Sequence, residues 1–235
     1  MPADVSHGSD PLVARLAQLE TGQVSDVLDE AGLGNQVLAS TLATLKPNTR
    51  FAGRAACLSG EPIITAPNVP SPLPADVLEQ VAGAGSVLVI GTGGFRAGSV
   101  MGGFVAYSLQ RGGCRGLITD GAIRDADEIR GLDFPVCCTG VTPINGARRW
   151  RLTKKDVAVP LPGQTHVPVL VQPRDLILAD GDGIVVIPAE VAERIVADTE
   201  ELARIEQRIG RELRTGAART EVFKNNPRFQ HIRKV

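Results

Sequence analysis

Residues 111–125 read RGGCRGLITDGAIRD, which is a glycine pair, a largely apolar run and a charged turn in succession. The apolar run, Cys114 to Thr119, has the length and composition of a buried strand. The turn continues to Arg130, so that four carboxylates and two arginines fall within the eleven residues that begin at Asp120. A turn of this composition is either a solvated surface turn or the site of a metal ion and a charged substrate.

The stretches on both sides repeat the pattern. SVLVIGT (86–92) and FPVCCTG (134–140) are short apolar runs, while FVAYSLQRGG (104–113) and DADEIRGL (125–132) have the character of helices. Strands that alternate with helices in this way predict βαβ units and parallel pairing. The sequence therefore predicts an α/β fold with a central parallel or mixed sheet.

The outer segments predict further elements around this centre. Residues 160–188 contain short apolar runs separated by turn residues, with a hairpin turn at 180–183, and predict a second β-layer. Residues 189–216 predict a long amphipathic C-terminal helix. The remaining expected elements are a strand at 51–60, a Pro-rich loop at 61–74, a helix at 75–85 and two short helices within 11–31, the second from Val24 to Ala31.

Composition excludes several classes of protein. With 43% hydrophobic residues, 22% charged residues, a net charge of −1 and only 3% aromatic residues, the chain has no basic or aromatic surface for nucleic acid. No apolar run reaches the roughly 20 residues of a membrane span. Four cysteines without C-x-x-C spacing and three scattered histidines argue against zinc and predict buried thiols in a cytoplasmic protein. We expect residues 1–10 to be a flexible tail, 11–216 a single domain and 217–235 a basic, mobile extension.

Two neighbouring stretches carry candidate chemistry. GTGGFRAGSVMGG (91–103) fits neither a dinucleotide fingerprint nor a P-loop, but Gly102 and Gly103 stand directly before a helix, where free N–H groups bind oxyanions. The alternative is a glycine-packed turn. Arg124 and Asp125 follow the next strand and should reach the same sheet edge, where aspartate is a ligand for Mg²⁺ or Mn²⁺ and arginine grips a carboxylate. The alternative here is a surface ion pair.

Other polar clusters are better interpreted as structural. Asp175, Asp180 and Asp182 accompany prolines and glycines in the turns of PRDLILADGDGIVVIP (173–188). Cys137 and Cys138 follow an apolar FPV, and no histidine base lies near them.

The order of these stretches resembles the RraA-like family, which includes regulators of ribonuclease E and class II pyruvate aldolases that act on 4-hydroxy-4-methyl-2-oxoglutarate or 4-carboxy-4-hydroxy-2-oxoadipate. The resemblance covers roughly residues 12–216. It is carried by TGQVSDVLDEAGL (21–33), Gly102-Gly103 before a helix, and above all a G-x-x-G-x-(apolar)-x-D-G-x-x-R-D pattern that runs from Gly113 to Asp125 without a gap. It implies a single-domain swivelling β/β/α fold that assembles as trimers or hexamers.

The resemblance also implies roles for individual residues. Asp125 would bind a divalent metal, Arg124 would contact the oxygens of a 2-oxo acid, and backbone amides from Gly102 and Gly103 through Phe104 to Val105 would cradle its carboxylate. A further carboxylate of the family's aldolases lies close to where this chain has Gly103, which is a departure from the pattern. Another comes from the C-terminal helix of a neighbouring subunit, and Glu200 or Glu201 is the candidate here.

These parts suit an enzyme that cleaves a 4-hydroxy-2-oxo acid. Cleavage between C3 and C4 leaves a pyruvate enolate, whose charge a metal and Arg124 would stabilise. Decarboxylation of oxaloacetate passes through the same enolate and would be a side activity. The rival interpretation is a non-catalytic regulator that binds a protein partner such as a ribonuclease. The complete Arg124-Asp125 motif favours the enzyme, and the departure at Gly103 favours the regulator or a changed substrate.

Overall fold

The computed structural model describes residues 10–63 and 71–235. The expected tail at residues 1–9 and the middle of the expected Pro-rich loop lie outside these ranges. Asp10 is already part of the fold, because its carboxylate accepts hydrogen bonds from the N–H groups of Leu12 and Val13 and caps the first helix.

Helices and strands alternate through the centre of the chain, as the apolar pattern predicted. The helices are α1 (Pro11–Leu16), α2 (Thr21–Glu30), α3 (Val77–Val81), α4 (Gly103–Arg111), α5 (Ala126–Arg130), α6 (Ala192–Arg214) and α7 (Arg219–Asn225). The strands are β1 (Ala43–Thr44), β2 (Phe51–Pro62), β3 (Ser86–Gly91), β4 (Gly116–Thr119), β5 (Ala122–Ile123), β6 (Val136–Cys138), β7 (Gly140–Val141), β8 (Trp150–Lys155), β9 (Val159–Leu161), β10 (Val169–Val171), β11 (Leu176–Ala179) and β12 (Ile184–Ile187).

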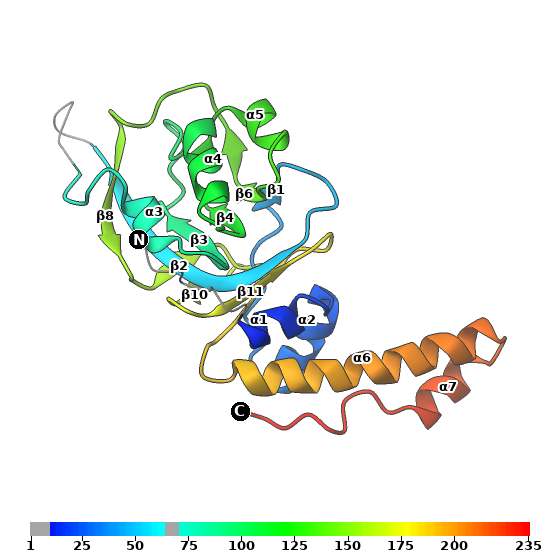
Figure 1. The fold of residues 1–235 in the computed structure, drawn as a ribbon. Coiled ribbons are helices and arrows are strands. Elements are labelled where there is room, and N and C mark those ends of the chain that lie inside the picture. The colour runs from blue at the N-terminus through cyan, green and yellow to red at the C-terminus, as the bar shows by residue number, and fades with distance from the viewer. Residues whose placement is uncertain (1–9, 64–70) are drawn as a thin grey trace, which may run out of the picture.

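A curled mixed sheet in the order β1-β6-β4-β3-β2-β11-β12 forms the centre of the molecule (Figure 1). The pairs β2–β3, β3–β4 and β4–β6 are parallel, as expected for βαβ units. Long β2 joins the two halves of the sheet, since its first residues pair with β11 and its last residues with β8, both antiparallel.

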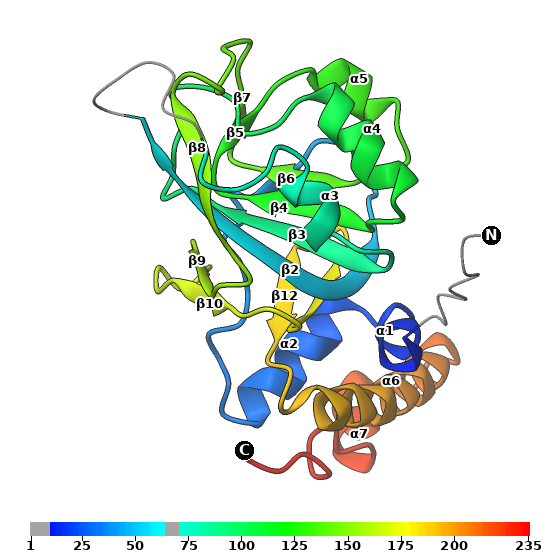
Figure 2. The same ribbon diagram turned by 60° about the vertical axis from the view of Figure 1, so that its left-hand side comes forward.

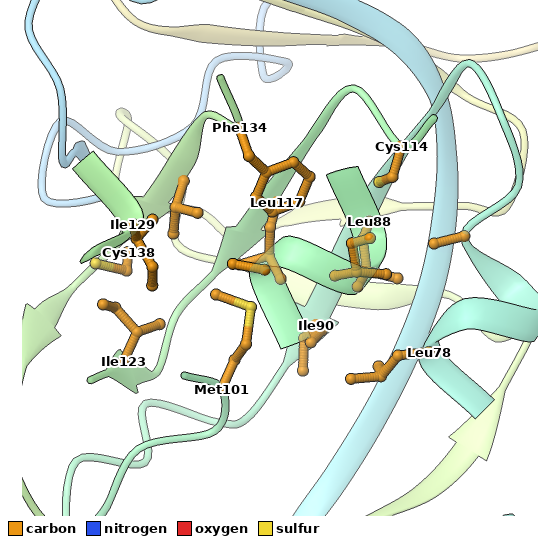
Figure 3. Close-up of a cluster of buried hydrophobic side chains, with 14 of the residues drawn as sticks. Leu78, Leu88, Ile90, Met101, Cys114, Leu117, Ile123, Ile129, Phe134 and Cys138 are labelled. Atoms are coloured by element: carbon orange, nitrogen blue, oxygen red, sulfur yellow. The ribbon is translucent and has the colours of Figure 1, made fainter. Parts of the chain in front are cut away.

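Both faces of the central strands are buried. Along β3, Leu88 and Ile90 face the layer of α3, α4 and α5, while Val87 and Val89 face the β9–β10 hairpin, as side-chain alternation in a strand requires. Figure 3 shows the first of these clusters, in which Met101 and Ile123 lie beside Ile129 of α5. This core fixes the turns that follow β3 and β4.

A second helical layer packs on the β11–β12 side of the sheet (Figure 2). Helix α6 buries Ile195, Leu202, Ile205 and Ile209, which is the stripe that the sequence predicted. Figure 1 shows α6 on the opposite side of the sheet from α4 and α5.

Three sequence expectations need correction. Strands β11 and β12 do form the expected hairpin, but they extend the main sheet, and from residues 160–188 β10 pairs with β9 in a separate two-stranded sheet. Helix α2 begins at Thr21, not Val24, because Glu20 and Gln23 form a capping box. The basic extension, expected to be mobile, packs along α6: Arg228 contacts Asp26 and Glu206 at 2.5 Å each, and Val222 is buried.

All four cysteines are free and buried, as expected. Burial raises the pKa of both Cys57 and Cys137 to about 12, with nearby carboxylates adding to the effect at Cys57 and the neighbouring Cys138 thiol at Cys137. Within the described part of the chain, no helix combines the length and the apolar character needed to cross a membrane.

Candidate functional site

The charged turn after β4 separates into a structural half and an open half. Asp120 is buried, and its carboxylate accepts the N–H of Thr92 at 2.6 Å, the hydroxyl of Thr92 at 2.9 Å and the N–H of Gly94 at 2.8 Å. It ties the loop after β3 to the loop after β4 and has no free oxygen to offer a ligand. Asp120 therefore shapes the turn.

Arg124 and Asp125 form the open half, between β5 and α5. The glycine-rich segment runs beside them, because Val100 N–H donates to Ala122 O at 2.8 Å and Arg124 N–H donates to Met101 O at 3.0 Å. This backbone pairing places Gly102 next to the Arg124-Asp125 turn. The two stretches that the sequence assigned to one sheet edge therefore meet.

Asp125 caps helix α4 from a different element. Its Oδ2 accepts the N–H of Gly103 at 3.0 Å and lies 3.4 Å from Arg124 Nε. The N-cap residue itself, Gly102, provides no side-chain cap. A carboxylate at this position interacts favourably with the positive end of the helix dipole. With the side chains of Arg124 and Asp125 36% and 39% exposed, both charges remain accessible to a ligand.

The backbone of Asp125 is in the left-handed region, with φ 58° and ψ 38°. Aspartate and asparagine tolerate this conformation better than most residues, but it is uncommon and clusters at functional positions. The conformation turns the chain so that the Asp125 carboxylate meets the α4 N-terminus and α5 begins at the next residue.

Gly102 and Gly103 lie close to the ends of the Arg124, Asp125 and Glu128 side chains. A Cβ at Gly102 would lie 2.6 Å from Asp125 Oδ2 and 2.9 Å from Arg124 Nε, and a Cβ at Gly103 would lie 2.5 Å from Glu128 Cδ. Among the described residues, the N–H groups of Phe104 and Val105 have no hydrogen-bond partner. These two amides are free to receive an oxyanion. The Phe104 side chain is 85% exposed, so only its backbone belongs to this arrangement.

A pocket of about 480 Å³ opens beside Arg124. Its volume is that of a small-molecule site. Gly102, Val105 and Arg124 form the wall nearest the charged turn, and Ser99 and Asn145 add polar groups. The other walls are largely apolar and include Leu73, Val77, Leu78, Met101, Trp150 and Leu152.

The donor set fits a hard divalent cation that keeps most of its waters. Asp125 presents a half-exposed carboxylate, and Glu128 a second one over the adjacent glycine. Across the described ranges, no cluster of three or more His, Cys, Asp or Glu side chains is placed to hold a metal. One or two carboxylates are what Mg²⁺ commonly takes from a protein, whereas a structural zinc site needs four ligands.

The remaining candidates have structural partners. Asp175 accepts the N–H groups of Gln172 and Ala189, and Asp180 accepts the N–H and hydroxyl of Thr21 and the N–H of Asp182. Glu200 binds Arg15, whose hydrogen bonds lower the pKa of that carboxyl, and Glu201 pairs with Arg204. Since α6 lies across the sheet from α4, neither glutamate reaches the Arg124-Asp125 turn of its own chain (Figure 1).

Two parts of this site were not predicted from the sequence. Glu128 is exposed at the start of α5, and its carboxylate lies against Gly103. Asn145, Gly146 and Trp150 line the pocket, and none of them was predicted as a site residue. No spacing rule connects residues near 75, 100 and 150. Trp150, the chain's single tryptophan, belongs both to the hydrophobic core cluster beneath α3 and α4 and to the pocket wall.

The domain is mixed α/β, and a carboxylate, an arginine and a helix N-terminus meet at one edge of its sheet. This arrangement is typical of sites that bind small anions and metal ions. Comparison with known proteins gives the family: residues 21–186 match the RraA-like model, described as Aldolase/RraA, and the chain belongs to this family.

Its relatives carry two kinds of name. A protein of Paraburkholderia phytofirmans named "Putative 4-hydroxy-4-methyl-2-oxoglutarate aldolase" is 33% identical over 155 residues, which cover 66% of this chain and 90% of the relative. The structure of Streptomyces coelicolor RraAS2, described as an unusual member of the RNase ES inhibitor RraA protein family, matches with a TM-score of 0.72 and 28% identity over 85% of this chain and 97% of that one. An uncharacterized Pseudomonas syringae protein shares the fold, with a TM-score of 0.76 and 24% identity over 90% and 96%.

Proposed function

We propose that the protein is a divalent-metal-dependent class II aldolase that cleaves a 4-hydroxy-2-oxo acid and releases pyruvate, with oxaloacetate decarboxylation as a side activity. The observation that carries the proposal is the arrangement at the α4 N-terminus. Asp125 accepts a hydrogen bond from Gly103 N–H, Arg124 lies beside it, and a pocket of about 480 Å³ is lined by Arg124, Gly102 and Val105. The aldolase names of relatives such as the Paraburkholderia protein support the same activity.

Each residue has a distinct task in this proposal. Arg124 and the free amides of Phe104 and Val105 bind the carboxylate and C2 oxygen of the substrate and orient the C3–C4 bond toward the pocket. Asp125 would hold Mg²⁺ or Mn²⁺, which as a Lewis acid would favour negative charge on the C2 oxygen. The fixed charge of Arg124 favours the same enolate, because it is in place before charge develops.

The apolar walls of the pocket would surround the part of the substrate beyond its carboxylate and C2 oxygen. Leu73, Leu78, Val100 and Leu152 would exclude bulk water from the reacting carbons, so that the charge of Arg124 acts more strongly on the enolate. Cleavage removes the proton of the C4 hydroxyl and breaks the C3–C4 bond, and a proton added at C3 converts the enolate to pyruvate. The four buried thiols agree with the reducing cytoplasm that we propose as the location of the enzyme.

We also propose that the chain acts as a homo-oligomer, a trimer or a hexamer. Phe104 and Tyr107 lie one turn apart on α4 and are 85% and 52% exposed. Large exposed apolar side chains at adjacent helical positions favour a protein contact. A contact next to the site would allow an acid such as Glu201 from a neighbouring copy to approach it.

The alternative function is that of a regulator that binds a protein partner such as a ribonuclease. The description of the Streptomyces structure favours it, as did the glycine at position 103. The carboxylate of Glu128 weighs against it, because an acid is present at this place after all.

Pyruvate release separates the two functions. Protein freed of metal with EDTA and then supplied with Mg²⁺ or Mn²⁺ is incubated with 4-hydroxy-4-methyl-2-oxoglutarate, 4-carboxy-4-hydroxy-2-oxoadipate and oxaloacetate, and pyruvate is measured with lactate dehydrogenase. We expect metal-dependent turnover of at least one diacid. Absence of turnover on all three by protein that binds the metal would refute the aldolase.

A further inference from the structure

We infer that Glu128 is a working residue of the site: its carboxylate, placed over Gly103, holds the hydrated metal together with Asp125. The inference rests on the proposed metal-dependent function and adds a residue to it. It also gives Gly103 a reason, which is to leave room for an acid delivered from another helix.

The packing of α5 against α4 positions Glu128 over Gly103. Glu128 lies on α5, which packs beside α4 in both views of the fold (Figures 1 and 2). A Cβ on Gly103 would lie 2.5 Å from Glu128 Cδ, so the carboxylate occupies the space that any side chain at position 103 would enter. Asp125 fills the corresponding space over Gly102. Both carboxylates are therefore neighbours of Gly103, since Asp125 Oδ2 accepts its N–H at 3.0 Å and Glu128 lies over its Cα.

The Glu128 carboxylate has no structural role in the part of the chain that the structure describes. Within residues 10–63 and 71–235, the Glu128 carboxylate has no hydrogen-bond or ion-pair partner. Its neighbour Asp127, on the same short helix, pairs with Arg130 and points into solvent, with a side chain that is 98% exposed. Of the two acids that begin α5, only Glu128 faces the glycine segment.

Negative charge is in excess at the α4 N-terminus. Asp125 and Glu128 bring two negative charges to the α4 N-terminus, and in the described chain Arg124 pairs with Asp125 alone, at 3.4 Å. The helix dipole offsets only part of the excess. A divalent cation between the carboxylates would remove their repulsion, and two carboxylates with several waters match the coordination of Mg²⁺ or Mn²⁺.

Mn²⁺ binding to the full chain tests the inference without reference to turnover. EDTA-treated wild-type protein, Glu128→Gln and Asp127→Asn are titrated with Mn²⁺, and free Mn²⁺ is followed by its electron paramagnetic resonance signal. We expect Glu128→Gln to weaken binding about tenfold, as loss of a residue that orders a metal's surroundings does. Asp127→Asn removes one charge from the same helix and should stay within twofold of wild type.

Thermal melting of the metal-free proteins separates this role from a structural one. Glu128→Gln removes a repulsion, so its metal-free Tm should equal or exceed that of wild type, and its gain in Tm from added Mn²⁺ should be smaller. A lower metal-free Tm with unchanged Mn²⁺ affinity would show a merely structural glutamate and overturn the inference.

An exchange of acids provides a second test. Gly103 is helical and lacks a positive φ, so aspartate fits its backbone once Glu128 is shortened. We expect Glu128→Ala to bind Mn²⁺ weakly and the double variant Gly103→Asp/Glu128→Ala to recover to within about threefold of wild type. A folded double variant as weak as Glu128→Ala would contradict the role given to this carboxylate.

The outcomes remain distinct from those of the proposed function. Wild-type protein that binds Mn²⁺ through Glu128 but releases no pyruvate would refute the aldolase and leave the inference standing. Pyruvate release with equal Mn²⁺ affinity in wild type and Glu128→Gln would overturn the inference and leave the aldolase standing. Wild-type protein that binds no Mn²⁺ would overturn the inference and the metal dependence together.

Discussion

At the scale of single residues, environment decides which of several similar side chains does chemistry. Asp120 and Asp125 are five positions apart in one turn, yet Asp120 is buried with both oxygens occupied, and Asp125 is half exposed at a helix N-terminus. The sequence identified the Arg124-Asp125 pair because these residues follow a buried strand. It did not single out Glu128, which is exposed but lies over Gly103, because exposure alone does not show which neighbour a long side chain covers.

Asp125→Asn tests the residue at the centre of the site. Asparagine tolerates the left-handed backbone at φ 58° as well as aspartate does, so the fold should be retained with a change in Tm of no more than a few degrees. The charge that attracts the metal is lost, and we expect metal-dependent pyruvate release to fall at least 100-fold, measured as kcat/KM. Asp127→Asn is the matched control. Unchanged kinetics in Asp125→Asn would mean that the metal binds elsewhere.

The thiols give a prediction about reactivity. Burial raises the pKa of Cys57 and Cys137 to about 12, so at pH 8 almost none of either is the reactive thiolate. Native protein should release less than one equivalent of thionitrobenzoate from Ellman's reagent within minutes, and unfolded protein should release four. Rapid reaction of a native thiol would show that one of these side chains is accessible.

At the scale of elements, the site exists because two loops after parallel strands are joined by backbone pairing. The βαβ rhythm predicted that the loops after β3 and β4 meet, and they do. The sequence did not predict that β11–β12 would join the main sheet, since antiparallel partners are selected by packing and not by local pattern. Nor did it predict the pocket, whose walls come from separate stretches of the chain near residues 75, 100, 124 and 150.

Gly102→Ala tests the close approach between these loops. A Cβ would lie 2.6 Å from Asp125 Oδ2 and 2.9 Å from Arg124 Nε, so the added methyl group should displace both side chains. We expect kcat/KM for pyruvate release to fall at least tenfold with only a modest loss of stability. Gly22→Ala, in α2, is the control: no atom lies within 4 Å of its Cβ, and it should leave activity unchanged and raise stability by up to about 0.5–1 kcal/mol. Equal activity in the two variants would contradict the packing described.

At the scale of the whole molecule, we propose that residues 11–216 form the family's domain and that residues 217–235 are an extension that stabilises it. Arg228 stacks on Phe229 at 4.6 Å and binds Asp26 and Glu206, and Val235 N–H donates to Ala31 O at 3.0 Å. Charge and composition predicted a solvated end, because they do not reveal that Val222, Phe229 and Ile232 pack on other helices.

Removal of residues 217–235 should therefore lower stability. Loss of the Val222, Phe229 and Ile232 contacts should cost at least about 2 kcal/mol, which is a fall of several degrees in Tm for a chain of this size. Differential scanning calorimetry of the full and shortened chains measures the change, and Arg228→Ala should fall between them. Identical melting of both chains would show that the extension contributes nothing.

Assembly is tested through the exposed face of α4. Wild-type protein should elute with the mass of a trimer or a hexamer in size-exclusion chromatography with light scattering, and Tyr107→Glu should dissociate into smaller species. Phe223→Glu, which changes an exposed aromatic residue on α7, should not. A monomeric wild type would refute the proposed oligomer.

The central claim is that the Arg124-Asp125 turn and the α4 N-terminus form one site for a metal ion and a 2-oxo acid. Crystals soaked with Mn²⁺ and pyruvate test it most directly through anomalous difference density. We predict a manganese peak next to the carboxylate of Asp125 on the side of Glu128, with the pyruvate carboxylate at the N–H groups of Phe104 and Val105. A manganese peak elsewhere, or pyruvate bound away from Arg124, would contradict the claim.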